Sequence, residues 1–353
     1  MSRSGPGALD AVFEPPSRLR ARFGWVCGMT ADGPFVERAL DRFSRQSTAQ
    51  RMLAGRVYLG LLLDPSNPQI PPLSAPGALH LAARTQPLPF RLLHAKVALL
   101  GFDDEESKQW CVRLVVSTGN WTAETLDRSL DLLWVVDLHS EHPSGPERSQ
   151  TEADVKAAAA FLSRLRERFV TDALHIEEGP QARATGVNIA MLDAWIDSLS
   201  PGDVAPRFIH NEDEPLIDLL PQAALRVGGS TRRNYLVLGS GFYGTGGSPN
   251  ALPDVPARIV RTLTAPEGGM LTLQPSVDVV VNPSACQGVA TAAAAIAATK
   301  GWRVIAPRDP HGDTGGVRSL HAKFIFAANW SEGGRATSPW LYLGSGNLTE
   351  PGF

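Results

Sequence analysis

The tripeptide His-Ala-Lys occurs twice in this 353-residue chain, and each copy is followed at the same distance by Gly-Asn. Composition would give only about 0.1 His-x-Lys triplets, because the chain has so few lysines and histidines. One shift of 227 residues relates the two sets. The paired residues are His94 and His321, Lys96 and Lys323, Gly119 and Gly346, Asn120 and Asn347, and Thr122 and Thr349. The repeat predicts two halves of similar fold, each carrying one copy.

The apolar pattern alternates between strand-like and helix-like stretches, as in residues 23–29, 33–44, 56–63 and 97–102. That order predicts an α/β fold. Side chains two apart on a strand share a face, so His94 and Lys96 should point the same way. We therefore expect two similar halves related by pseudo-twofold symmetry, each a mixed β-sheet flanked by helices.

Three segments are expected along the chain. Residues 1–150 form the first half, residues 151–226 a bridging helix and connector, and residues 227–353 the second half. Thr151 and Asp154 resemble a capping box at the start of the bridging helix, and residues 130–138 are predicted to form one strand. The second half ends six residues after Asn347, so we expect it to be incomplete at its C-terminus.

The duplicated residue types suit the chemistry of a phosphodiester. Hydrolysis needs a nucleophile for phosphorus, an acid for the leaving oxygen, and cationic or amide donors for the transition-state oxygens. Two histidines, two lysines and two asparagines supply that set without a metal or cofactor. One imidazole can act as the neutral nucleophile while the other enters protonated, because histidine titrates near neutral pH.

These motifs resemble the phospholipase D superfamily, whose duplicated His-x-Lys is followed by a Gly/Ser-rich strand end carrying Asn. The common superfamily pattern also has an Asp five residues after the Lys, where this chain has Gly101 and Ala328. That departure is similar to the tyrosyl-DNA phosphodiesterase branch. The segment 344–349, Gly-Ser-Gly-Asn-Leu-Thr, is similar to nuclease-type members.

The resemblance implies a role for each motif residue, with the metal-independent site between the halves. His94 would be the nucleophile that forms a phosphohistidine, and His321 the general acid and then the base. Phosphate oxygens would be bound by Lys96, Lys323, Asn120 and Asn347. An acidic side chain beyond the Asn often orients a histidine in such enzymes, and Asp131 is the candidate.

Other side chains are candidates for substrate binding. Ser117, Thr118 and Ser345 stand beside the asparagines and could donate hydrogen bonds to phosphate. Phe242 and Tyr243 could stack on a base.

The net charge of −3 argues against a broad non-specific nucleic-acid binder without excluding a local basic groove. Nucleic acid is nevertheless the expected partner, DNA before RNA, in end processing or as a nuclease. The three cysteines lack metal-ligand spacing and fit a cytoplasmic protein, and no apolar run is long enough for membrane insertion. Two alternatives remain: a phospholipase or phosphatidyltransferase, and a non-catalytic nucleic-acid-binding subunit, perhaps of a larger assembly.

Three further motifs are given structural interpretations. Residues 239–244 match G-x-G-x-x-G, but Pro249 and Pro253 interrupt the helix that a dinucleotide site requires, so we expect a loop beside the catalytic residues. The His- and Asp/Glu-bearing stretches 210–214 and 309–313 lack an established metal-ligand spacing and are interpreted as polar loops.

Overall fold

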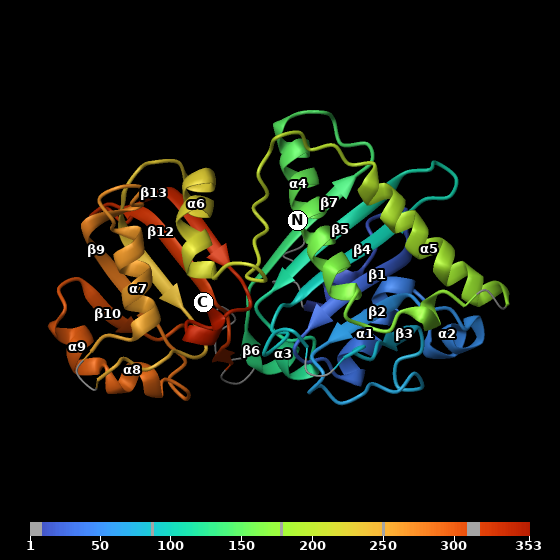
Figure 1. Ribbon diagram of the computed structural model, residues 1–353, viewed down its shortest axis with the longest axis horizontal. Coiled ribbons are helices and arrows are strands. Elements are labelled where there is room, and N and C mark those ends of the chain that lie inside the picture. Colours follow the sequence, from blue (N-terminus) through green and yellow to red (C-terminus); the bar gives the residue numbers. More distant parts are fainter. Residues whose placement is uncertain (1–8, 86–87, 177–178, 249–250, 309–317) are drawn as a thin grey trace. The chain divides into compact units, whose positions relative to one another are not determined.

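The computed structural model describes residues 9–85, 88–176, 179–248, 251–308 and 318–353 (Figure 1). The chain forms two compact units. Unit 1 comprises Met1–Asp127 and Leu133–Phe208, and unit 2 comprises Arg128–Leu132 and Ile209–Phe353. Among the described residues, no helix combines the length and apolar character needed to cross a membrane.

Unit 1 is built on a six-stranded mixed sheet. Across the sheet the strands are β3 (Ala78–His80), β2 (Leu59–Leu63), β1 (Arg20–Gly28), β4 (Val97–Asp103), β5 (Trp110–Ser117) and β7 (Leu133–His139). The first three strands run parallel to one another, and each later strand is antiparallel to its neighbour. Their buried residues are mostly apolar, as expected for a sheet covered on both faces.

Separate helices cover the two faces of this sheet. The helical segments of unit 1 are η1 (Leu9–Phe13), α1 (Gly33–Ser44), α2 (Thr48–Ala54), α3 (Ala123–Arg128), α4 (Pro146–Arg166), η2 (Asp172–Leu174) and α5 (Pro180–Asp197). One apolar core contains α1 residues such as Phe35 and Leu40, and the other contains Leu162 of α4 and Leu192 of α5. Helices α4 and α5 run across the strands in Figure 1.

Unit 2 is built on a five-stranded mixed sheet. Its strands in order are β10 (Trp302–Ile305), β9 (Leu271–Val280), β8 (Arg233–Gly239), β12 (Phe324–Trp330) and β13 (Ala336–Leu343). Its helical segments are α6 (Leu216–Gly228), α7 (Asp254–Leu263), α8 (Gln287–Thr291), α9 (Ala293–Ala298) and η4 (Glu350–Gly352). Helices α6 to α9 all contribute to one apolar core, which covers one face of this sheet.

The two sheets share one topology. The order β3-β2-β1-β4-β5 matches β10-β9-β8-β12-β13, with the same parallel and antiparallel pairings. The register matches too, since Leu99 pairs with Leu114 while Phe326 pairs with Leu341, 227 residues later in both strands. The predicted α/β class, with two similar mixed sheets flanked by helices, is confirmed.

The boundaries differ from the three segments expected from the sequence. Helices α4 and α5, expected in a bridging segment, belong to unit 1. Helix α4 begins at Pro146 rather than near Thr151, with Gly145 preceding its first turn. Asp154 is no capping residue: it is fully buried and binds the Arg207 side chain and backbone N–H at the end of unit 1.

The strand expected over residues 130–138 is in fact two strands in different units. The short β6 (Ser129–Leu130) pairs in parallel with β11 (Ser319–Leu320), whereas β7 joins the first sheet. The segment 128–132 therefore belongs to unit 2, although the chain on both sides of it belongs to unit 1. It carries Asp131 into the unit that contains the second His-Ala-Lys.

Candidate functional site

We call His94, Lys96 and Asn120 the first half-site, and His321, Lys323 and Asn347 the second. His94 and Lys96 lie just before the N-terminal end of β4. The Lys96 ammonium is buried and donates to the His94 carbonyl oxygen over 2.8 Å, and its Nζ lies 3.2 Å from His94 Nδ1. The Lys96 carbonyl accepts the Ser117 N–H at the end of β5, which joins the two motif segments. The His-x-Lys spacing therefore brings an imidazole and an ammonium into direct contact.

Asn120 lies in the loop that follows β5. The loop is closed by Ser117, whose hydroxyl donates to the Gly119 carbonyl and accepts the Gly119 N–H. The Oδ1 atom of Asn120 is buried and has no hydrogen-bond partner within the described part of the chain. Since buried polar atoms are usually paired, a donor from a bound substrate would find an acceptor here.

The residue after Asn120 anchors the loop in the core. Trp121 is fully buried, and its indole N–H donates to the Cys27 carbonyl over 2.8 Å. Its backbone N–H donates to the Thr30 carbonyl, and Asp32 accepts the Ala123 N–H at the start of α3. The same Asp32 carboxylate accepts the Phe35 N–H and so caps α1.

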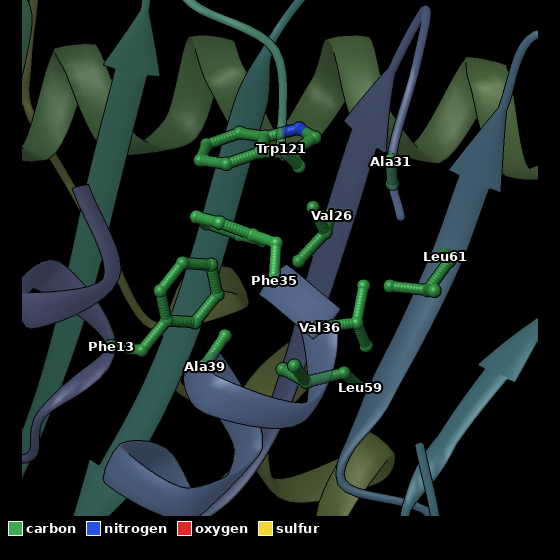
Figure 2. Close-up of a pocket in the computed structure, with 9 residues that line it drawn as sticks. All are labelled: Phe13, Val26, Ala31, Phe35, Val36, Ala39, Leu59, Leu61 and Trp121. Atoms are coloured by element: carbon green, nitrogen blue, oxygen red, sulfur yellow. The ribbon is translucent and has the colours of Figure 1, made fainter. Parts of the chain in front are cut away.

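A small cavity lies beneath Trp121, as Figure 2 shows. It holds about 10 Å³ and is lined by apolar side chains of η1, β1, β2 and α1, with Ala31 and Trp121 at one end. An apolar cavity of this size offers a water no polar partners and is a packing defect rather than a substrate pocket.

The second half-site joins three charged or titratable side chains in a row. Nδ1 of His321 lies 3.1 Å from Asp131 Oδ1, and Lys323 Nζ lies 2.9 Å from His321 Nε2. Asp131 is held there because the Leu130 carbonyl accepts the N–H groups of His321 and Ala322. The side chains of His321 and Asp131 are 24% and 10% exposed, so solvent reaches part of each of them.

Lys323 is fully buried, and burial lowers its pKa from the usual 10.5 to about 8, while the Asp131 charge acts in the opposite direction. Desolvation penalises the charged ammonium more than the single carboxylate compensates. This lysine is therefore partly neutral at mildly alkaline pH.

The Asn347 loop repeats the construction of the Asn120 loop. The Lys323 carbonyl accepts the Gly344 N–H, as that of Lys96 accepts the Ser117 N–H. Leu348 forms a bridge with Tyr243, the counterpart of the bridge between Trp121 and Ala31. The Oδ1 atom of Asn347 is also buried without a hydrogen-bond partner in the described residues.

The G-x-G-x-x-G segment is a loop beside His321. A methyl group added at Gly241 would lie 3.2 Å from the His321 Cα atom, so only a glycine fits without displacement. Phe242 is 49% exposed on this loop and stays a candidate for stacking. Tyr243, the other candidate for stacking on a base, is instead a core residue: its hydroxyl lies 2.9 and 2.7 Å from the carbonyl oxygens of Leu238 and Val280 and donates its one proton there.

The smaller predicted substrate ligands differ in environment. Ser117 is fully buried and its hydroxyl closes the turn already described. Thr118 is also fully buried, whereas Ser345 is half-buried. A direct role of these three side chains in phosphate binding stays a prediction.

Two other clusters combine residue types that can bind metals. Cys111, Asp137 and His139 lie together, but Arg113 binds both carboxylate oxygens of Asp137 at 2.6 and 2.7 Å, and burial raises the pKa of the Cys111 thiol. A second group, in stretch 210–214, contains His210, Glu212 and Asp213, and both acidic members are exposed. The stretch 309–313 lies outside the described residues.

Several residues that shape the half-sites are not among the predicted site residues. Trp121 follows the predicted ligand Asn120 and Gly241 precedes the predicted Phe242, but neither belongs to the duplicated motif. Asp64 and Asn67 follow β2 and lie far in sequence from both motifs. A signal did exist for Asp64, because Pro-Ser follows it as it follows Asn282 after the equivalent strand β9.

No protein-family model matches the sequence, and no curated protein matches it at a significant level. Among solved structures, the chain is similar to polyphosphate kinase from Porphyromonas gingivalis, with 13% sequence identity and a TM-score of 0.39. The similarity covers 96% of this chain and 42% of that one, so this chain spans less than half of the length of that protein.

Proposed function

We propose that the chain is a phospholipase D-like phosphodiesterase that works through a phosphohistidine. The Asp131–His321–Lys323 row supports this most directly, because it combines a carboxylate-held imidazole with a buried ammonium. The His94–Lys96 contact supplies a second imidazole and ammonium. The proposal requires both histidines to act on the same phosphorus atom.

In the first step, a neutral ring nitrogen of His94 attacks phosphorus and forms a P–N bond. The P–O bond to the leaving alcohol breaks, and its oxygen takes a proton from the His321 imidazolium. In the second step, neutral His321 removes a proton from water, whose oxygen attacks phosphorus and releases His94. His321 thereby regains its proton, and one diester and one water give a monoester and an alcohol.

The remaining residues stabilise charge and orientation in this scheme. Asp131 accepts from Nδ1 of His321 and so directs Nε2 toward Lys323 and the phosphate. The same contact holds the imidazole ring in one orientation and one tautomer. Lys96 and Lys323 balance the charge of the phosphate oxygens, and the Asn120 and Asn347 amides add hydrogen bonds.

Nucleic acid is the substrate class that we propose. One support is the similarity of segment 344–349 to nuclease-type sequences. The other is the exposed side chain of Phe242, which follows Gly241, a residue packed against the His321 backbone. An exposed aromatic ring can stack on a base of single-stranded nucleic acid.

The test is hydrolysis in EDTA of single-stranded DNA that carries either a bulky 3′-phosphoryl adduct or a plain 3′-hydroxyl. Wild type is compared with His94→Ala and His321→Ala, and His175→Ala is the matched control because this histidine is exposed and outside both half-sites. Acid-labile labelled phosphate retained on the wild type and absent from His94→Ala would identify the intermediate.

Loss of turnover in both half-site variants, with the control active, supports the two-histidine mechanism. Removal of the adduct points to end processing, and internal cleavage points to a nuclease. Turnover of phosphatidylcholine vesicles with no cleavage of DNA would contradict the proposed substrate. Binding of DNA that His94→Ala leaves intact, without any turnover, would contradict catalysis.

A further inference from the structure

We propose that the turn Asp64–Asn67 is a positioning element of the first half-site, which sets His94 relative to Asn120. Neither residue is expected to touch substrate. The kinetic consequence rests on the proposed function, whereas the structural consequence does not.

Asp64 forms a hydrogen bond with Leu93, the residue that precedes His94 in the sequence. Its Oδ2 atom accepts the Leu93 N–H over 2.8 Å, and its Oδ1 atom accepts the N–H and hydroxyl of Ser66. The Asp64 N–H donates to the Gly28 carbonyl at the end of β1. Asp64 is 5% exposed, and hydrogen bonds from buried backbone groups to a carboxylate oxygen are among the stronger ones. Leu93 is thereby tied to the sheet immediately before His94.

Asn67 fixes the segment that pairs with the Asn120 loop. Its Oδ1 atom accepts the Ala31 N–H over 3.1 Å, and its own N–H donates to the Asp64 carbonyl. Ala31 forms the bridge with Trp121, the residue after Asn120. Figure 2 shows Ala31 and Trp121 at the same end of the cavity. One four-residue turn thus binds the segments that carry both motif parts.

The second half-site explains why an aspartate is needed here. Asn282 occupies the equivalent turn after β9, and its Oδ1 atom accepts the Ser284 N–H and hydroxyl. In unit 2, the backbone at His321 is held by the Leu130 carbonyl of β6. The described contacts of Asn282 include no bond to the segment before His321. In unit 1 the second carboxylate oxygen of Asp64 accepts the Leu93 N–H, a bond that the amide nitrogen of an asparagine could not make.

The decisive variant is Asp64→Asn, which keeps the size and one oxygen but replaces the other oxygen with an amide donor. That donor cannot accept the Leu93 N–H while the remaining oxygen serves Ser66. Asp104→Asn is the matched control, because Asp104 also accepts a backbone N–H and a serine hydroxyl in a turn, at the far end of β4.

We expect amide hydrogen exchange at Leu93 to rise about 10- to 100-fold in Asp64→Asn, with a changed His94 ring signal in NMR. We also expect kcat to fall about 10- to 100-fold with KM nearly unchanged, because misplacing a reacting group costs rate more than binding. Asn67→Ala should shift the Asn120 side-chain signals, and it serves as the second variant if Asp64→Asn does not fold. Asp104→Asn should change none of these quantities.

Unchanged Leu93 exchange and an unchanged His94 signal in folded Asp64→Asn would overturn the positioning role. A kcat loss matched by an equal loss in Asp104→Asn would do so as well. The exchange and ring-signal measurements need no turnover, so they decide this proposal even if wild type hydrolyses no diester. Absence of turnover in wild type would count against the proposed function alone.

Discussion

Asp131 and His321 are 190 positions apart in the sequence, yet Asp131 Oδ1 lies 3.1 Å from His321 Nδ1. The carboxylate that follows the first motif therefore serves the histidine of the second. This pairing fixes which ring nitrogen of His321 carries a proton in its neutral form, since only Nδ1–H can donate to the carboxylate.

Replacing Asp131 with Asn should lower kcat by about 100- to 10,000-fold, because an amide no longer selects the Nδ1–H tautomer of His321 or fixes the orientation of its ring. The measurement is kcat together with nitrogen NMR of the His321 ring. Asp127→Asn, at an exposed residue of α3, is the control and should retain full activity. Normal kcat in Asp131→Asn would show that the contact does not serve catalysis.

Alkaline pH should weaken phosphate binding through Lys323. Since burial lowers its pKa to about 8, the ammonium is lost above that pH, and kcat/KM should fall up to tenfold per pH unit. Because the folded-state pKa lies below the unfolded value of 10.5, the contribution of Lys323 to stability rises between these two pH values.

The pH profile of kcat/KM between about pH 7 and 10 measures the fall in activity. Urea unfolding over the same range measures the rise in the free energy of unfolding. Lys323→Met should be weakly active and lack the alkaline step assigned to this lysine. An identical step in the variant would assign the ionisation to another group.

A methyl group at Gly241 should disturb the His321 backbone. Gly241→Ala would place Cβ 3.0 Å from the Leu320 carbonyl and 3.2 Å from His321 Cα, so kcat should fall about tenfold. Gly247→Ala is the matched control in the same loop, because no atom lies within 4 Å of its added Cβ. Equal kcat values for the two variants would contradict a close fit at Gly241.

Trp121→Phe should lower the free energy of unfolding by about 1–3 kcal/mol, since it enlarges the cavity and removes the bond to the Cys27 carbonyl. Trp330→Phe, at a residue that is 47% exposed on β12, should change it by less than about 0.5 kcal/mol. Urea denaturation of both variants measures the difference. A cost at Trp330 as large as that at Trp121 would contradict the role assigned to burial.

The sequence predicted the elements whose signals are local. Helix α1 begins and ends where expected, because Asp32 caps it, Pro34 fits its first turn and its apolar residues follow a helical period. Strands β1 and β4 contain continuous apolar runs and β5 is rich in valine, and the motif spacing placed His94 and Lys96 together.

The features that were missed depend on long-range pairing. The two-residue strand β6 is too short to produce a periodic pattern, so residues 130–138 were predicted as one strand. Tyr243 was a candidate for base stacking because a tyrosine in a glycine-rich loop gives no sign of the buried carbonyls beside its hydroxyl. Asp64 contacts Leu93 across 29 residues, a pairing that a single sequence does not encode visibly.

The short segment 128–132 also limits how this chain could be divided or exchanged. A gene fragment that encodes only residues 209–353 would supply His321 and Lys323 without Asp131, and would leave β11 without its parallel neighbour. The two halves carry the same sequence motif, but one half cannot be exchanged for the other as a contiguous segment. Recombination between them would have to preserve five residues that lie, in sequence, within the opposite half.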